Sequence, residues 1–477
     1  MKKTLCVLSA AALATTLVGC KSDSIITKDA GEQLQVYTLD QLKGREVKIE
    51  LWHSFGDTIT KSLNPLIKEF EETYKGQGYN ISVKVESISG GYDGLRQRVV
   101  QGIPSNALPS LLLGYPDHFA DYLKGNVLLP LTDFVNSTNP GVGLSQADQD
   151  DFIDSYWNEN TQFDSAKNIY GLPFNKSTEV FTYNATLIDP ILKELGYVEN
   201  EGDLWTDPTW DEVFAVAEKV KGSLKTPSNS QNKAYPVMYD STSNFFITVA
   251  RQWGGKYTER VNQDNIESGK ILFDNAEVKE GLAYFQSQAN KDLFQLPGKV
   301  GQKYSSTLFI NQEAAMVIGS SAGIKNNASD SFVVKSTSLP QKSQEENRAV
   351  IQQGTNLAIL SKSTDNYQRL AAFELIKFLT SASIQEKFSI QTGYLPVRNS
   401  VFESETYKAF LNEEGNMVAG AIKAGKSQTE YLYTDTAFVG SSTVRRQVGL
   451  VVEDVFLSNK SIDEAIATAY EALPNFN

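Results

Sequence analysis

The sequence holds few of the side chains that most often carry chemistry in proteins. Among its 477 residues there are two histidines, His53 and His118, and two cysteines, Cys6 and Cys20. Zinc sites and iron–sulfur clusters draw most of their ligands from these residue types, so no metal site is expected. Hydrolysis that depends on a histidine base would have to use one of the two histidines. The 57 aspartates and glutamates leave carboxylate-based glycoside hydrolysis and oxygen-ligated calcium open.

The charge balance of the chain is acidic. Lys plus Arg number 44 against the 57 acidic residues, which gives a formal net charge of −13. Binding to the phosphates of a nucleic acid needs a concentrated basic face, so a nucleic acid partner is not expected. The hydrophobic content of 41% is that of an ordinary globular protein, and the length predicts two or three compact units.

The first twenty residues predict export from the cytoplasm. Lys2 and Lys3 precede an apolar stretch from Leu5 to Leu17, which is too short to span a bilayer and is typical of a signal peptide. The stretch ends in Leu17-Val18-Gly19-Cys20, which resembles a bacterial lipobox. An ordinary secretory signal with an incidental cysteine is the alternative.

Lipid attachment would place the protein at the cell membrane, on its extracytoplasmic side. We expect residues 1–19 to be the signal peptide and Cys20 to be the lipidated residue. Residues 20–44 are polar and weakly patterned, which predicts a tether between the lipid and the folded body. No later stretch reaches about 18 apolar residues, so no transmembrane helix is predicted.

Hydrophobic periodicity predicts the elements that must position any site. Apolar residues alternate over 47–51 and 81–85, as in strands, and 111–113 is a short apolar run typical of a buried parallel strand. Between the first two, residues 63–70 carry a helical stripe, and helices are also predicted over 372–379 and 462–473. Strand–helix alternation favours an α/β fold with a parallel sheet. A chain of this length with α/β character is more easily two lobes than one. Two such lobes would face each other across a cleft that hinge motion can close on a small ligand.

Five segments, taken together in their order and spacing, resemble the extracellular solute-binding proteins of ABC importers, of the sugar-binding class. They are Leu51-Trp52-His53-Ser54, Gly171-Leu172-Pro173-Phe174-Asn175, Thr209-Trp210-Asp211-Glu212, Phe309-Ile310-Asn311-Gln312-Glu313-Ala314-Ala315-Met316 and Thr392-Gly393-Tyr394-Leu395-Pro396-Val397. The resemblance implies a type II periplasmic-binding-protein fold with two α/β lobes joined by crossing strands. It also implies binding without turnover or a cofactor. The expected partners of this monomer are a small polar ligand and a membrane permease pair with its ATPase.

The two lobes are expected to be discontinuous in the sequence. Lobe one is expected to hold residues 45–152 and 301–353. Lobe two is expected to hold residues 156–298 and 354–477.

Within that class the chain is most similar to the sn-glycerol-3-phosphate-binding family. Matching that family's ligand contacts residue by residue gives Tyr92, Ser177, Trp210, Ser320, Gly354, Tyr394 and Arg446. One position departs, because the family's ligand-contacting Glu aligns with Pro116, and Asp117 lies one step along. Trp253, in Trp253-Gly254-Gly255, is a further candidate for stacking on a polyol.

These residue types suit a phosphate ester. The guanidinium of Arg446 can donate to two phosphate oxygens at once, and serine hydroxyls and tyrosine phenols can donate as well. The leading ligand is therefore sn-glycerol 3-phosphate or a glycerophosphodiester. A neutral oligosaccharide, with Arg446 structural, is the alternative, and a carboxylate-based hydrolase is a third, less favoured interpretation. Structural roles also compete at single positions, since Trp210 shares a helical face with Val213 and Phe214 and would then pack in the core.

Overall fold

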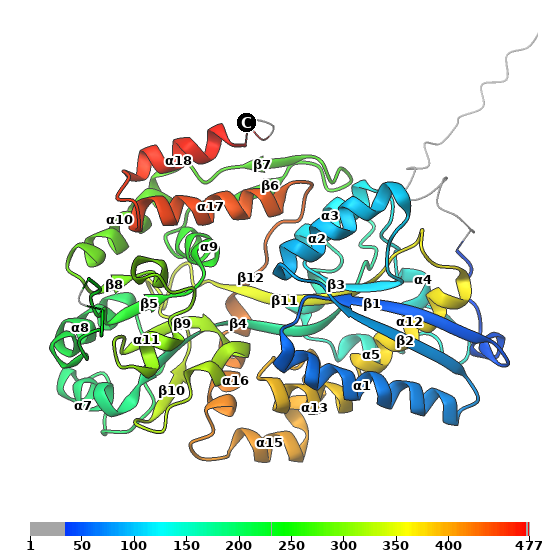
Figure 1. The fold of residues 1–477 in the computed structure, drawn as a ribbon, viewed down its shortest axis with the longest axis horizontal. Coiled ribbons are helices and arrows are strands. Elements are labelled where there is room, and N and C mark those ends of the chain that lie inside the picture. The colour runs from blue at the N-terminus through cyan, green and yellow to red at the C-terminus, as the bar shows by residue number, and fades with distance from the viewer. Residues whose placement is uncertain (1–33, 230, 474–475, 477) are drawn as a thin grey trace, which may run out of the picture.

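Residues 34–229, 231–473 and 476 are described by the structure, which is a computed structural model. They form two α/β lobes that lie beside each other and are joined by long strands (Figure 1). The predicted signal peptide, the predicted lipidation site at Cys20 and the first part of the predicted tether lie outside the described residues.

A single ten-stranded sheet runs through both lobes. Its strand order is β2-β1-β3-β11-β4-β9-β5-β8, with β10 beside β4 and β12 beside β11. The bounds of these strands are β1 Glu46–His53, β2 Asn80–Ser87, β3 Leu111–Gly114, β4 Leu172–Asn184, β5 Val237–Tyr239, β8 Phe294–Gln295, β9 Met316–Ser320, β10 Val334–Thr337, β11 Val350–Ile359 and β12 Leu432–Tyr433. A separate antiparallel hairpin is formed by β6 Thr258–Arg260 and β7 Gly269–Ile271.

The predicted elements near the N-terminus are confirmed. Alternating apolar residues of β1 are buried, and β1 pairs in parallel with β2 and β3. The helical stripe is buried as well, with Leu63 and Phe70 fully covered within α1 (Asp57–Gly76). A parallel sheet covered by a helix is therefore what the periodicity of this region predicts.

Helices cover both lobes. Those of the first lobe are α1, α2 Gly91–Gly102, α3 Pro116–Lys124, α4 Thr132–Val135, α5 Gln146–Asp150, α6 Asp154–Asn158, α12 Asn366–Leu379 and α13 Ala382–Thr392. Those of the second lobe are α7 Ala185–Leu195, α8 Trp210–Val220, α9 Thr242–Gln252, α10 Ala276–Asn290, α11 Ser306–Ile310, α17 Ser441–Phe456 and α18 Ile462–Glu471. Below the crossing strands lie α14 Asn399–Glu403, α15 Glu405–Leu411 and α16 Met417–Ser427 (Figure 1).

Two strands carry the chain between the lobes. All thirteen residues of β4 are buried. The first half of β4 pairs with β11, and its second half pairs with β9 and β10. Strand β11 runs the other way and pairs with β3 at its end. Because both strands belong to both lobes, they form the floor between them and a direct backbone route for a hinge, and the segment 398–437 carries the chain across a third time.

The buried apolar clusters define the lobes and correct the predicted boundaries. We call residues 34–174 with 357–397 lobe one, and 181–351 with 438–473 lobe two, because these segments share a core. The expectation that 301–353 belongs to lobe one is wrong, since β9 pairs with β5 and packs in the other core. The expectation that 354–397 belongs to lobe two is also wrong, since β11 returns the chain to β3 before α12 begins.

Part of the predicted tether also belongs to lobe one. Leu42 is fully buried, and Leu34, Val36 and Leu39 pack against the same cluster. The backbone N–H of Gln35 donates to the side chain of Asn366 in α12. Composition alone predicted that the folded body begins at residue 45. In the structure it begins at least ten residues earlier.

The β6–β7 hairpin is a strap from lobe two to lobe one. Its tip buries Ile266 in an apolar cluster that otherwise belongs mainly to lobe one. The backbone N–H and the hydroxyl of Ser165 donate to the Asp264 carboxylate at 2.8 and 2.9 Å. Lys124, the last residue of α3, pairs with Glu267 at 2.6 Å. Besides the crossing strands, the lobes are thus connected at one end of the space between them.

Candidate ligand-binding cleft

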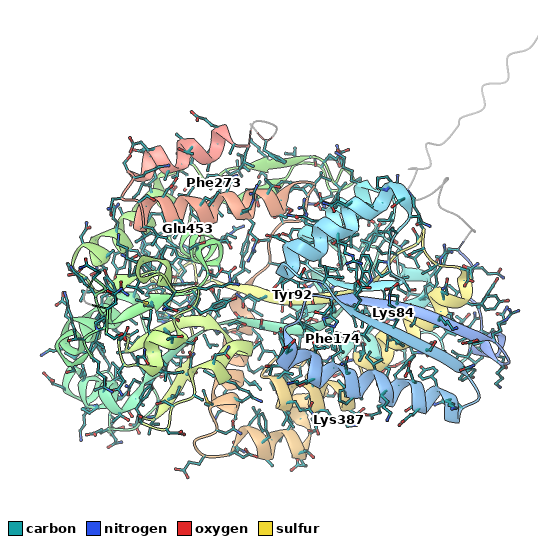
Figure 2. The ribbon with its side chains drawn as sticks, in the orientation of Figure 1. Lys84, Tyr92, Phe174, Phe273, Lys387 and Glu453 are labelled. Carbon is teal, nitrogen blue, oxygen red and sulfur yellow. The ribbon has the colours of Figure 1, made fainter. Side chains whose placement is uncertain are left out.

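Two adjoining cavities of about 560 and 890 Å³ lie between the lobes. Both are lined by Tyr92, Tyr115, Asn244 and Glu453, so they are two arms of one cleft. Figure 2 shows Tyr92 and Glu453 on opposite lobes. We call the smaller cavity, beside α17, the α17 arm, and the larger one, beside the end of β9, the β9 arm. Their volumes are in the range of pockets for small molecules.

The cleft brings together most of the residues predicted from the sequence. The β9 arm is lined by five of them, which are Tyr92, Ser177, Ser320, Gly354 and Tyr394. The α17 arm is lined by Tyr92 again and by Asp117 and Arg446. Across the paired strands β4 and β11, Ser177 lies opposite Gln353, the residue before Gly354, and Ser320 ends β9. Residues as far apart in the sequence as Tyr92 and Arg446 therefore line one cleft.

Gly354 occupies a position that only glycine fits. Its φ is +92°, and an added Cβ would lie 1.9 Å from the backbone oxygen of Asn175 on β4. The strand can approach β4 this closely only without a side chain. The backbone N–H of Gly354 donates to the phenol of Tyr115 at 3.2 Å. This N–H is thus directed at a tyrosine that was not among the residues predicted from the sequence.

Three tyrosines gather at the junction of the two arms. The rings of Tyr92 and Tyr115 meet edge to face at 5.0 Å, and Asn175 donates to the phenol of Tyr92 at 3.5 Å. Burial raises the pKa of Tyr92 and Tyr394, and it raises the pKa of Tyr115 to about 12. All three phenols are therefore neutral and can donate or accept hydrogen bonds. Tyr115 was missed because a lone tyrosine after a strand has no distinguishing sequence signal.

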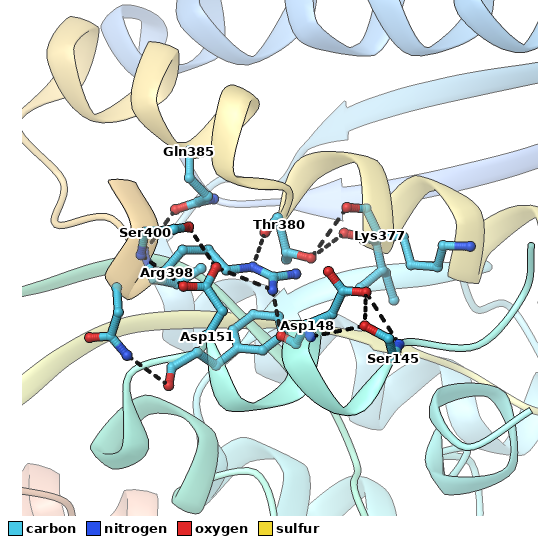
Figure 3. A network of polar contacts seen from close by, with 12 residues as sticks. Ser145, Asp148, Asp151, Lys377, Thr380, Gln385, Arg398 and Ser400 are labelled. Atoms are coloured by element: carbon cyan, nitrogen blue, oxygen red, sulfur yellow. Dashed lines mark hydrogen bonds and ion pairs between the residues drawn. The ribbon is translucent and has the colours of Figure 1, made fainter. Parts of the chain in front are cut away.

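The segment that carries Tyr394 is held to lobe one by a polar network (Figure 3). Arg398 donates to the backbone oxygens of Thr380 and Asp148 and stacks on Phe152 at 3.8 Å. The side chain of Gln385 accepts from the backbone N–H of Val397 at 3.2 Å. These bonds fix the turn after α13, so the Tyr394 ring is presented from a rigid support.

Asp117 lies one residue after Pro116, the position at which the family's carboxylate was expected. It follows Pro116 in the first turn of α3, it is buried, and it lines the α17 arm. Burial raises the pKa of its carboxyl group, whereas Arg445 lowers it. A carboxylate one step along from the expected position is therefore present in the cleft.

Arg445, rather than Arg446, is the arginine held inside the cleft. Its guanidinium donates to Asp435 and to the side-chain oxygen of Asn244. Burial alone would lower the pKa of Arg445, but Asp435 and Asp117 raise it, so the group stays charged. Arg446 also lines the α17 arm, but it is exposed and has no ion pair among the described residues. Adjacent residues on a helix point about 100° apart, and the sequence could not decide which of them faces inward.

Trp210 and Trp253 do not line the cleft, which corrects both predictions. Trp210 is 2% exposed, packs edge to face on Phe285 at 4.8 Å, and donates from its ring nitrogen to Gln252. Trp253 packs on the same Phe285. Both belong to the core of lobe two. The apolar helical face that Trp210 shares with its neighbours decided its position, as the competing interpretation of the sequence anticipated.

Carboxylates outnumber cations along the cleft. Apart from Glu159, which pairs with buried Lys176, the acidic lining residues are Asp93, Asp117, Glu179, Asp240, Asp435 and Glu453. The cations that line it are Lys303, Arg445 and Arg446. The field in the cleft therefore favours ligands without a large net negative charge.

A buried charged network lies under the crossing strands. Lys176 on β4 pairs with Glu159 and donates to the backbone oxygen of Gly354 at 3.1 Å. Asn356 on β11 donates to the same carboxylate at 2.7 Å, and Gln352 donates to it as well. Burial lowers the pKa of Lys176, whereas Glu159 raises it. The floor of the cleft is thus fixed by hydrogen bonds between both strands and α6.

The two histidines are electrically neutral in the fold. Burial lowers the pKa of both His53 and His118 to about 4. His118 lines the α17 arm, and His53 lies in β1. Over the part of the chain that the structure describes, no group of three or more His, Cys, Asp or Glu side chains is arranged to hold a metal ion.

Comparison with known proteins identifies the family. Residues 65–412 match the bacterial extracellular solute-binding proteins. The chain belongs to this family. It is 23% identical over 415 residues to the sn-glycerol-3-phosphate-binding periplasmic protein UgpB of Brucella melitensis, covering 85% of this chain and 88% of the relative.

Solved structures share the fold of this solute-binding protein. UgpB from Mycobacterium tuberculosis in complex with glycerophosphocholine superposes with a TM-score of 0.72 at 18% identity, over 91% of this chain and 98% of that one. An ABC substrate-binding protein from Listeria monocytogenes in complex with cycloalternan gives 0.70 at 17% identity, over 90% and 98%. These likenesses confirm the predicted type II periplasmic-binding-protein fold with crossing strands.

The family also settles the question of enzyme activity. Solute-binding proteins are binding components of ABC importers that act outside the cytoplasm, and they are not enzymes. No helix among the described residues is both long and apolar enough to cross a membrane.

Two segments of this solute-binding protein match short sequence motifs of other families without forming the sites of those families. Gly420–Ser427 has the spacing of a phosphate-binding P-loop, but it lies within the helix α16, where the backbone N–H of Gly420 is bonded to Asn416. A P-loop needs a loop with free N–H groups before its helix. Gly319–Gly323 has the spacing of a hydrolase nucleophile elbow, but the Ser321 hydroxyl has no hydrogen-bond partner among the described side chains. Neither motif forms its site.

Proposed function

We propose that the protein captures a zwitterionic glycerophosphodiester, such as glycerophosphocholine, between its lobes and delivers it to the permease of an ABC importer. The observation that carries the proposal is the position of Arg445, a charged guanidinium in the cleft with carboxylates on either side. Arg445 would bind the phosphate, and the surrounding carboxylates would favour a cationic headgroup.

The charge of the cleft distinguishes between the two phosphate ligands expected from the sequence. A phosphate monoester such as sn-glycerol 3-phosphate carries close to two negative charges at pH 7, because its second pKa is about 6. A phosphodiester carries one, and a choline group cancels it. The excess of carboxylates along the cleft therefore supports the diester.

The glycerol part needs neutral donors and acceptors. The hydroxyls of Ser177 and Ser320 and the phenol of Tyr394 line the β9 arm. Asp117 offers an acceptor in the α17 arm, in place of the family's Glu. Each hydrogen bond to a charged group contributes about 1.5–3 kcal/mol before the costs of desolvation and lobe closure are subtracted.

A neutral oligosaccharide is the second candidate. The cluster of neutral phenols around Tyr92 and the combined size of the two arms favour a sugar. The similar protein from Listeria monocytogenes was solved with cycloalternan, which is a carbohydrate. In that case Arg445 would act as a structural partner of Asp435.

Titration calorimetry with glycerophosphocholine, sn-glycerol 3-phosphate and maltose tests the proposal. We expect glycerophosphocholine to bind most tightly and sn-glycerol 3-phosphate more weakly. Binding of maltose together with no heat from either phosphate would overturn the proposal and favour the sugar.

We also propose that Cys20 carries a lipid that holds the protein on the outer face of the cell membrane, where the permease lies. The lipobox-like sequence supports this assignment. Cys20→Ser should move the protein from the membrane fraction to the soluble fraction, and retention in the membrane fraction would contradict it.

A further inference from the structure

Glu179 is a buried carboxylate to which the proposed function gives no individual role. It lies on β4 two residues after Ser177, so both side chains point to the same face of the strand, and both line the β9 arm. Its exposed fraction is 0%. Its carboxylate accepts from the side-chain amide of Asn244 at 3.0 Å and from the phenol of Tyr239. Such a charge is stable in a protein interior only when it has partners like these.

The bond to Glu179 determines how the amide of Asn244 is oriented. An asparagine side chain has a donor end and an acceptor end. Because the donor end faces the carboxylate of Glu179, the acceptor oxygen faces the other way, and there it accepts from the guanidinium of Arg445. A flipped amide would place oxygen against carboxylate and NH₂ against guanidinium, and both contacts would be repulsive.

The guanidinium of Arg445 is thereby held from two sides. One terminal nitrogen donates to Asp435, and the other donates to Asn244. The guanidinium has five N–H donors, so others remain for a ligand in the α17 arm. Glu179 itself lies in the β9 arm, and Asn244 lines both arms.

We infer that Glu179 is a positioning residue for anion recognition, which acts through Asn244 to fix the guanidinium of Arg445 in the cleft. The inference rests on the proposed function in so far as Arg445 binds a phosphate. It adds a link between the two arms, because the residue that orients the arginine of the α17 arm lies in the β9 arm.

The protonation of Glu179 gives this role a measurable signature. Burial raises the pKa of Glu179 to about 7, with a smaller contribution from Asp240, whereas Tyr239, Asn244 and Arg445 lower it. When the carboxylate is protonated it loses its charge, and its hydrogen bond to Asn244 becomes weaker. Positioning therefore predicts weaker phosphate binding as the pH falls through about 7. A purely electrostatic role predicts the opposite, because protonation removes a negative charge near the anion.

Glu179→Gln and Asp240→Asn form a matched pair of variants for this test. Both remove one negative charge from the β9 arm, but Asp240 has no bond to Asn244 and instead accepts from the backbone N–H of Ser305 at 2.7 Å. With glycerophosphocholine as the probe, Glu179→Gln should weaken binding by about tenfold at pH 8, as expected for one weakened charge-assisted hydrogen bond. Asp240→Asn should change it much less, because the bond between Glu179 and Asn244 stays intact. Equal effects of the two variants, or stronger binding by Glu179→Gln, would overturn the inference.

Two further measurements separate positioning from direct contact. The effect of Glu179→Gln should disappear in an Asn244→Ala background, because the link is already cut, whereas a direct contact with the ligand would persist there. The wild-type affinity for glycerophosphocholine should fall between pH 8 and 6, and the affinity of Glu179→Gln should not. The phosphodiester has no proton to gain in this range, so the change belongs to the protein.

A ligand-free measurement distinguishes failure of the inference from failure of the proposed function. If glycerophosphocholine binds neither the wild type nor the variants, the proposed function fails. The positioning role of Glu179 is then tested by comparing the position of Arg445 in crystal structures of the ligand-free wild type and of Glu179→Gln. We expect Arg445 to hold one position in the wild type and to leave it in the variant. An unchanged Arg445 in Glu179→Gln would overturn the positioning role.

Discussion

The two walls of the cleft differ in how they are charged. Lobe one contributes the phenols of Tyr92, Tyr115 and Tyr394, the neutral His118 and the carboxylates of Asp93 and Asp117, and among its lining residues there is no lysine or arginine. All the lining cations stand on lobe two, where acidic and amide side chains hold Arg445 in place. The difference indicates that lobe two recognises anionic groups and lobe one recognises hydroxyl groups and cationic groups. Selectivity would then require both lobes to meet around the ligand.

Removing the cation of lobe two should break this division most severely. Arg445→Ala should weaken binding of glycerophosphocholine by about 2–5 kcal/mol, the range for a buried charge partner that is lost. Arg446→Ala is the matched control on the neighbouring position, and we expect less than about 1 kcal/mol because its side chain is exposed. Calorimetry measures both. A larger loss in Arg446→Ala would return the role to the residue that the sequence analysis favoured.

The pH dependence of stability should distinguish Glu179, on the part of β4 that faces lobe two, from the histidines of lobe one. The pKa of Glu179 is about 7 in the fold and near 4.5 without it, so the folded protein holds an extra proton between these values. Its contribution to the free energy of unfolding is therefore lost as the pH rises from 4.5 to 7, by at most about 1.4 kcal/mol per pH unit. Urea denaturation at several pH values should show Glu179→Gln gaining stability over the wild type through this window. Parallel profiles would contradict the shift.

The histidines of lobe one should change the stability with pH in the direction opposite to that of Glu179. Their pKa is about 4 in the fold against 6.5 without it, so the unfolded chain binds more protons between these values. Stability should therefore rise with pH from about 4 to 6.5 on their account. In His118→Asn this rise should be smaller in the same urea series, and an unchanged profile would show that His118 is not neutral in the fold.

The strap offers the mildest test, because it touches neither wall. Asp264→Ala removes the bonds to Ser165 in lobe one. We expect a small weakening by the same factor for a phosphate ligand and for a sugar, since only the balance between open and closed lobes changes. Asp274→Ala, which removes an exposed ion pair to Lys279 within lobe two, should leave both affinities unchanged. A ligand-dependent effect of Asp264→Ala would show that the strap reaches the site.

The sequence predicted those parts of the cleft that depend on local patterns. Ser177, Ser320 and Gly354, which the family resemblance implied as ligand contacts, lie on strands or at strand ends, and all three line the cleft. Arg445 could not be distinguished from Arg446, because the choice depends on tertiary contacts with Asp435 in the loop before α17 and with Asn244, which is 201 residues away in the sequence.

The failures have the same physical origin on a larger scale. Trp210 carries the family's motif, yet its own helical face is apolar and takes it into the core of lobe two. The segments on either side of β11 were assigned to the wrong lobes. The direction in which β11 crosses depends on its pairing with β3 and β4, and pairing between distant strands leaves no local signal in the sequence.

The Lys176–Glu159 pair lies at the junction of the lobes, where both side chains are almost completely buried. Separating the two ions would break a buried ion pair and leave each charge with only its neutral hydrogen-bond partners, at a cost of several kcal/mol. Swinging of the lobes must therefore leave this bond intact and take up its rotation in the strand segments on either side. We therefore expect the Lys176–Glu159 pair to stay fixed while the two lobes move. The same pair should keep Gly354 in one position in the floor of the cleft, whether the lobes are open or closed.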